Sequence, residues 1–159
     1  MLSKLIVIAF ILISVFCKNI AHGVTLPSAL DIYNQVYTLQ PGANVGVAYD
    51  LLGVPHETSD MPPMFLWFPA PNSAIIISLL NNTIIENSGY KEIYEEMHLA
   101  RQRYRELKEE FFEILGAAVK EFELGTAWLV ENYFFTLDYE EVNDNFGQRT
   151  NVTVLFLAQ

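Results

Sequence analysis

His56 is the first side chain of this 159-residue sequence to consider for chemistry, because it lies in a polar segment, Pro-His-Glu-Thr-Ser-Asp, at residues 55–60. A loop histidine can serve as a general base, and loops often carry functional residues. Glu57 or Asp60 could orient its imidazole. His56 is therefore the candidate catalytic residue, and hydrolysis is the reaction it would serve, although most loop histidines are simply exposed to solvent.

A second motif places a carboxylate and an imidazole on one face of a predicted helix. Glu95 and His98 have the Glu-x-x-His spacing that occurs in di-iron helix bundles. Such a centre needs two copies of the motif, and this sequence has one. Both residues lie off the apolar stripe of their helix, so we expect them to face water. The sequence predicts neither a metal nor a cofactor, with Glu95 and His98 as the candidate ligands if a metal binds.

Other catalytic arrangements are missing from the sequence. The single cysteine, Cys17, lies in a segment that we expect to be removed, which excludes thiol chemistry. No Gly-x-Ser-x-Gly or His-Glu-x-x-His motif is present, and the glycines are too scattered for a phosphate-binding loop. The sequence therefore favours a protein that is not an enzyme.

Residues 1–23 have the features of a signal peptide. Lys4 precedes a thirteen-residue, almost entirely apolar run at residues 5–17, and Ala21 and Gly23 occupy the −3 and −1 positions of a cleavage site. The run is shorter than the roughly 20 apolar residues of a membrane-spanning helix. We expect cleavage, no transmembrane segment afterwards, and export to a periplasm or the extracellular space; an uncleaved anchor is the alternative.

Removal of this leader would leave a strongly acidic chain. Without Lys4 and Lys18, seven basic residues stand against nineteen acidic ones, which gives a net charge of −12. Nucleic-acid binding and charge-driven binding to anionic lipid both require clustered cations. The charge therefore excludes nucleic acid and disfavours a membrane surface as partners.

The remaining residues, 24–159, predict a single α+β domain without internal repeats. Ser28 is the expected N-cap of a short N-terminal helix. We expect a mostly antiparallel five-stranded sheet that ends in a C-terminal β-hairpin, whose turn falls within residues 140–148. The five predicted strands are residues 45–52, 64–68, 74–80, 126–139 and 151–158.

The strongest periodic signal predicts one long amphipathic helix at about residues 89–123. Its apolar positions alternate in steps of four and three, as in a coiled coil. Unbroken, it would be about 52 Å long, whereas a compact chain of this size is about 35–40 Å across. Either Gly116 divides the helix, or one end projects and binds a partner. The stripe consists of Ile93, Met97, Ala100, Tyr104, Leu107, Phe111, Ile114 and Ala118.

A short apolar segment at residues 64–68 is bracketed by prolines on both sides. It is either a buried strand or an apolar edge that docks into a partner, since aromatic anchors often dominate interface energies. The predicted partner-binding residues are Phe65, Trp67 and Phe68 of this segment and Met97, Tyr104, Leu107 and Phe111 of the helix.

These observations predict an exported, non-catalytic interaction protein. It would form homo-oligomers or join a larger extracytoplasmic assembly through the long helix and the Trp/Phe segment. The first alternative is a carrier of a small hydrophobic ligand, held in an aromatic-lined pocket between helix and sheet. The second alternative is a hydrolase that uses His56.

Overall fold

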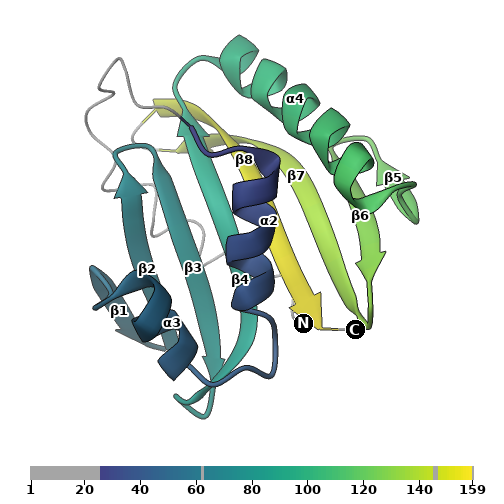
Figure 1. Ribbon diagram of the computed structural model, residues 1–159. Helices are drawn as coiled ribbons and strands as arrows, with labels where there is room; N and C mark the ends of the chain where they lie inside the picture. The colour runs from purple at the N-terminus through teal and green to yellow at the C-terminus, as the bar shows by residue number, and fades with distance from the viewer. Residues whose placement is uncertain (1–25, 62, 145–146, 159) are drawn as a thin grey trace.

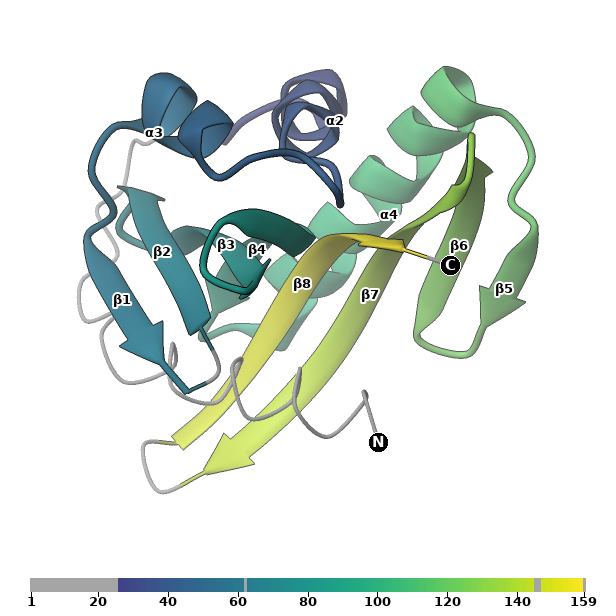
Figure 2. The same cartoon turned by 90° about the horizontal axis from the view of Figure 1, so that it is seen from below.

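The computed structural model describes residues 26–61, 63–144 and 147–158, and the predicted signal peptide lies outside them. The described residues form three helices and one eight-stranded, fully antiparallel sheet, with the helices on one face (Figures 1 and 2). We call the face under the helices the inner face and the opposite one the outer face. The predicted α+β class is confirmed, whereas the predicted number of strands is wrong.

The chain builds the sheet in two halves of similar topology. Each half starts with helix and continues as a four-strand meander, and the last strands of the two halves, β4 and β8, pair at the centre. The sheet order is therefore β1-β2-β3-β4-β8-β7-β6-β5. The first half contains α2 (Ala29–Thr38), α3 (Gly46–Leu52), β1 (Glu57–Asp60), β2 (Pro63–Ala70), β3 (Ser73–Leu80) and β4 (Ile84–Tyr94). The second contains α4 (Met97–Leu115), β5 (Lys120–Phe122), β6 (Gly125–Val130), β7 (Tyr133–Asp144) and β8 (Gly147–Ala158).

Helix α2 begins as the sequence predicts, with Ser28 as its N-cap. The Ser28 hydroxyl accepts a hydrogen bond from the Asp31 backbone N–H, and the Asp31 carboxylate accepts one from the Ser28 backbone, which completes a capping box. The Ser28 hydroxyl also donates to the Asp31 carboxylate, and this bond, together with the one from the Ser28 backbone N–H, holds the pKa of Asp31 below its ordinary value. Ile32 and Val36 are buried against the inner face, so the cap fixes where this helix meets the sheet.

The predicted helix at residues 89–123 is wrong at both ends. Its first residues belong to strand β4, and α4 ends at Leu115 because Gly116 adopts a positive φ of 77° that breaks the helical path. The nineteen residues of α4 span about 28 Å, so the helix fits on the sheet. None of the helices in the described residues combines the length and hydropathy that a bilayer crossing needs.

Strands β4 and β5 take up the two ends of the predicted helix, and three further errors complete the change from the predicted five strands to eight. Residues 45–52 contain helix α3, whose first turn is held by a hydrogen bond from the Gly46 N–H to the Asn44 side chain. Strand β1 lies in the predicted loop, and the predicted strand at residues 126–139 is divided by a turn at Glu131, where φ is 55°. A short apolar run does not distinguish a buried strand from a helix, so the error at α3 has a physical cause.

The main core lies between the inner face and the helices. Helix α4 contributes Leu107 and Phe111 to this core, and Phe111 packs on Phe135 of β7 and Trp128 of β6. Because successive strand residues point to opposite faces, the neighbours of these sheet residues lie on the outer face. The outer face has its own smaller apolar cluster, formed by Met64, Leu66, Ala74, Ile76 and Ile93.

Candidate functional site

A buried ionic cluster joins α4 to β4 on the inner face. Glu92 is 0% exposed and accepts three charge-assisted hydrogen bonds from Arg103, Nη2 to Oε1 at 3.0 Å, Nε to Oε2 at 3.0 Å and Nε to Oε1 at 3.3 Å. Tyr90 and Tyr94 also donate their hydroxyls to the same carboxylate. The Nη2 of Arg103 donates to the carbonyl of Pro27 at 2.6 Å, which ties the chain ahead of α2 to this cluster.

The electrostatics of this cluster favour a fixed, saturated arrangement. Burial and the charge of Glu92 raise the pKa of Tyr90 and of Tyr94 well above the ordinary value, so both hydroxyls stay protonated donors. Burial alone would lower the pKa of Arg103, but its hydrogen bonds to Glu92 and the charge of that carboxylate raise it. Three side chains thus occupy the oxygens of Glu92, which makes the cluster a structural clamp.

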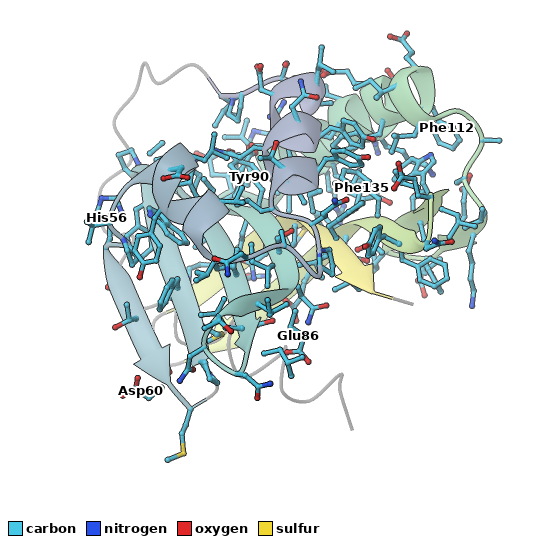
Figure 3. All side chains as sticks on the ribbon, turned by 60° about the horizontal axis from the view of Figure 1, so that its bottom comes forward. His56, Asp60, Glu86, Tyr90, Phe112 and Phe135 are labelled. Carbon is cyan, nitrogen blue, oxygen red and sulfur yellow. The ribbon has the colours of Figure 1, made fainter. Side chains whose placement is uncertain are left out.

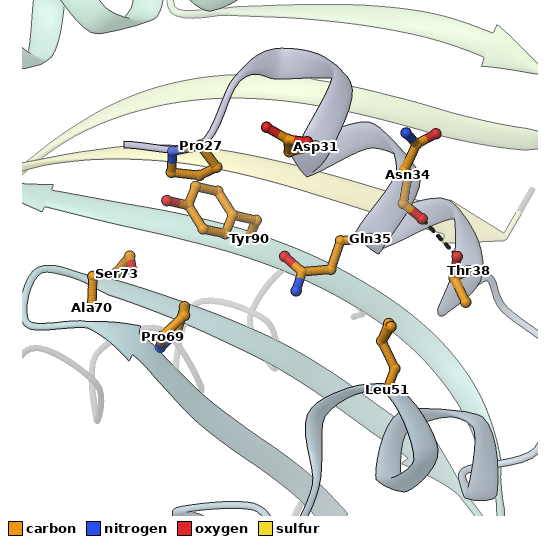
Figure 4. A pocket seen from close by; sticks show the side chains of 10 residues that line it. All are labelled: Pro27, Asp31, Asn34, Gln35, Thr38, Leu51, Pro69, Ala70, Ser73 and Tyr90. Carbon is orange, nitrogen blue, oxygen red and sulfur yellow. Dashed lines mark hydrogen bonds between the residues drawn. The ribbon is translucent and has the colours of Figure 1, made fainter. Parts of the chain in front are cut away.

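A groove of about 470 Å³ opens beside the ring of Tyr90, between α2, α3 and the β2–β3 turn (Figure 4). Asn34 and Gln35 line it from α2, and Leu51 lines it from α3. The residues around it include one carboxylate and no lysine or arginine, which suits a neutral or cationic molecule better than an anion. The lining residues are Pro27, Asp31, Asn34, Gln35, Thr38, Leu51, Pro69, Ala70, Ser73 and Tyr90.

Four large apolar side chains are exposed at the β5–β7 end of the sheet. Phe122, Leu124, Leu129 and Phe134 are 52%, 53%, 47% and 38% exposed, and we call them the outer apolar patch. Leu129 and Phe134 are cross-strand partners on β6 and β7. They point to the outer face because their neighbours Trp128 and Phe135 are buried under the helices. Phe122 pairs with Gly125, four residues along β6 from Leu129, so the patch has two parts, Leu129 with Phe134 and Phe122 with Leu124. Exposed apolar side chains of this kind are typical of an interaction surface.

Acidic side chains follow the outer apolar patch along the same face of β7. Asp138 and Glu140 share this face with Phe134, because all three are separated by even numbers of residues. Asp138 accepts a hydrogen bond from the Thr136 hydroxyl at 2.8 Å, and burial, together with the charge of Glu140, raises its pKa. Gly125 leaves room for Asp138, since a Cβ there would lie 2.4 Å from the carboxylate Oδ1.

The candidate catalytic residue His56 lies at the β1 edge of the sheet (Figure 3). Its Nδ1 accepts a hydrogen bond from the Phe68 N–H at 3.0 Å, and its ring centroid lies 5.8 Å from that of Phe68, with the two rings tilted by 32°. An accepting Nδ1 requires its hydrogen on Nε2 in the neutral ring. These contacts give His56 a role in joining β1 to β2, and catalysis by His56 stays a prediction.

The candidate metal ligands Glu95 and His98 are both exposed, but Glu95 precedes α4 and His98 lies in its first turn, so they do not share the helical face that the motif predicts. The Nδ1 of His98 lies 3.4 Å from the carboxylate of Glu96 rather than that of Glu95. Across the described ranges, no group of three or more histidine, cysteine, aspartate or glutamate side chains could hold a metal ion. The structure therefore does not bring a ligand set together at these two residues.

The predicted partner-binding residues lie mainly inside this chain. Leu107, Phe111 and Trp67 are buried, and the indole N–H of Trp67 donates to the Gly53 carbonyl at 3.1 Å. Partner binding through these residues stays a prediction, but the sheet of the same chain already covers Ala100, Leu107 and Phe111 of the predicted stripe, whereas Ile114 of that stripe is 36% exposed. Phe65, Met97 and Tyr104 are half-buried and pack on the main core, and half-buried Phe68 packs on the outer-face cluster.

The sequence reasoning missed the outer apolar patch, although β6 and β7 carry a signal for it. Trp128-Leu129 and Phe134-Phe135 are adjacent apolar pairs within strands, so one member of each pair must face away from the core.

Comparisons with family models, with curated proteins and with solved structures find no match to this chain. The functional argument therefore depends on the geometry of the molecule.

Proposed function

We propose that this chain is an exported, non-catalytic protein-binding domain that docks on its partner through the outer apolar patch. The exposure of Phe122, Leu124, Leu129 and Phe134 is the observation that carries the proposal. In an antiparallel sheet with one face in solvent, polar residues on that face ordinarily alternate along each strand with apolar residues on the core face. Leu129 and Phe134 lie directly opposite each other and break that alternation. This pair of one aliphatic and one aromatic side chain resembles the anchors of an interface.

The inner face supports the non-catalytic part of the proposal. Glu92 is deeply buried, and three side chains donate hydrogen bonds to its carboxylate, so this carboxylate has a structural role. Helix α4 uses its apolar stripe on the sheet, so in this proposal the outer apolar patch replaces that stripe as the docking surface. Its exposed residues require no rearrangement of the core to reach a partner.

Site-specific photo-crosslinking tests this proposal. A photoreactive phenylalanine analogue placed at position 129 or 134 should capture the same protein in the source organism, and the analogue at Leu30, which is exposed on α2, should not. The captured protein, once purified, should bind the wild-type domain at least tenfold more tightly than the variant Leu129→Gln/Phe134→Gln. The matched control Leu30→Gln/Leu99→Gln removes two exposed leucines on α2 and α4 and should bind like wild type. Equal binding by both double variants would refute the docking surface.

A second candidate function, binding of a small molecule, is favoured by the groove beside Tyr90. Its volume of about 470 Å³ lies in the range of small-molecule sites, and carboxamides on one wall face apolar residues on the other. Native mass spectrometry of protein purified from its source should then show a bound mass that Gln35→Leu removes and the exposed control Gln102→Leu retains. A wild-type protein that carries no extra mass would count against this candidate.

A further inference from the structure

We infer that the partner of the outer apolar patch presents a cationic amphipathic segment. Its apolar side chains would contact Leu129 and Phe134, and its lysine or arginine would pair with Asp138 and Glu140. This inference rests on the proposed function and adds the chemistry of the partner. Its starting observation is that one face of one strand, β7, is apolar at Phe134 and acidic at Asp138 and Glu140.

The spacing along β7 defines the partner geometry. Strand residues rise about 3.3 Å each, so Asp138 and Glu140 lie about 13 Å and 20 Å from Phe134 along the strand. A segment of about two and a half to four helical turns, or of four to six extended residues, covers that span. An apolar residue seated on Leu129 and Phe134 would therefore place a basic residue of the same segment beside the two carboxylates.

The electrostatics favour a cation at the acidic end. Asp138 is partly desolvated, and its pKa is raised by that burial and by the neighbouring Glu140. The Thr136 hydroxyl offsets this in part, whereas a guanidinium or ammonium group would offset it more strongly through a charge-assisted bond. Two lysines of this chain lie on the same face. The Lys120 ammonium lies 4.7 Å from the Phe122 ring centroid, and Lys91 is buried on β4.

The charge of the whole chain points to a different protein rather than a second copy. With a net charge of −12 after removal of the leader, the domain attracts basic partners over distance and repels its own kind. A second copy would also bring the same two carboxylates to this face unless its lysines were placed opposite them. A basic partner is attracted both by the two carboxylates of this face and by the net negative charge of the whole domain.

Two designed peptides with the same leucines test the inference by fluorescence anisotropy on residues 24–159. One carries lysines between its leucines, and the other carries glutamates at the same positions. The lysine peptide should bind the wild-type domain, and at least fivefold more weakly when sodium chloride rises from 50 to 300 mM. It should bind Leu129→Gln/Phe134→Gln about tenfold more weakly than wild type. The glutamate peptide should bind at least tenfold more weakly than the lysine peptide.

Matched charge variants separate a local site from general attraction. Asp138→Asn/Glu140→Gln should weaken the lysine peptide about fivefold, whereas Glu106→Gln/Glu109→Gln, which makes the same charge change on the exposed face of α4, should change binding less than twofold. Neutralising Asp138 removes a desolvated charge, so this variant should keep its fold, as circular dichroism can check. Equal losses in the two variants, or equal binding of both peptides, would overturn the inference.

The two proposals fail in different ways. If the crosslinked partner binds Asp138→Asn/Glu140→Gln like wild type but not Leu129→Gln/Phe134→Gln, the cationic segment is wrong and the docking surface stands. If sedimentation shows a dimer that Leu129→Gln/Phe134→Gln dissociates, the occupant of the outer apolar patch is a second copy and the inference is overturned. If Leu129→Gln/Phe134→Gln binds peptide and partner normally, both proposals are refuted.

Discussion

Arg103→Met should lower the free energy of unfolding by about 3–5 kcal/mol, because it leaves the carboxylate of Glu92 buried without its cation. Arg103 donates three hydrogen bonds to Glu92 and one to the Pro27 carbonyl, so the substitution also releases the chain before α2. A loss of this size is a large part of the 5–15 kcal/mol that stabilises a typical domain. Urea denaturation followed by tryptophan fluorescence measures it, as a lower midpoint at an unchanged slope.

Arg101→Met is the matched control for this prediction. Arg101 lies two residues earlier on α4 and pairs with Glu141 at 3.3 Å, but both side chains are largely exposed. An exposed pair contributes at most about 1 kcal/mol, so Arg101→Met should change the midpoint little. Equal effects of the two substitutions would contradict the burial of the Glu92–Arg103 pair.

Removing the whole ionic cluster should be milder than removing one member. The combined variant Tyr90→Phe/Glu92→Leu/Tyr94→Phe/Arg103→Met deletes the charges and both hydroxyls that bond to them. Replacement of a buried ion pair by apolar residues of similar volume is often neutral or stabilising. This variant should therefore recover most of the stability that Arg103→Met loses.

Elements with strong local signals could be predicted from the sequence. Ser28 and Asp31 form the capping box that begins α2, and the β-branched run Ile75-Ile76-Ile77 lies in β3. The closing strand and the C-terminal hairpin were also predictable, because apolar residues alternate at Val152, Val154 and Phe156. In each of these elements the nearest neighbours in sequence carry the information.

The strand at the start of the predicted helix could not be predicted, because long-range pairing with β8 holds residues 87–94 in β4. Gly89 interrupts no local pattern, yet a Cβ at that position would lie 2.7 Å from Cδ2 of Leu155 and 2.9 Å from the Val154 carbonyl. Close pairing of β4 with β8 thus needs glycine there. Ile93 fits both a heptad stripe and the outer face of a strand, so its spacing from Met97 extended the predicted helix by coincidence.

The candidate site was predictable only in part, for a related reason. Sequence reasoning examined His56 and the apolar stripe of α4 because histidines and heptads have known chemistry and packing. The outer apolar patch depends on which face each strand residue takes, and that follows from the register of Leu129 with Phe134. Register is a property of paired strands, so no single segment of the sequence specifies it.

Phe111→Ala should cost about 3–5 kcal/mol of stability, as large-to-small substitutions of buried phenylalanine do. Phe111 is buried, its ring centroid lies 4.9 Å from that of Phe135 in an edge-on contact, and it lies 5.9 Å from that of Trp128. Ile114→Ala, three residues later on the exposed side of α4, should cost less than about 1 kcal/mol. Guanidinium denaturation of both variants measures the contrast.

The same pair of variants separates a helix that packs on its own sheet from a helix that pairs with another chain. If the stripe of α4 serves the core, Phe111→Ala lowers the unfolding midpoint, and sedimentation gives the same mass as wild type at every protein concentration. If the stripe is a coiled-coil seam, Phe111→Ala lowers the mass instead, and the stability of wild type rises with concentration because folding is then linked to association. The edge-on contact of Phe111 with Phe135 favours the first outcome, since one ring cannot fill both positions.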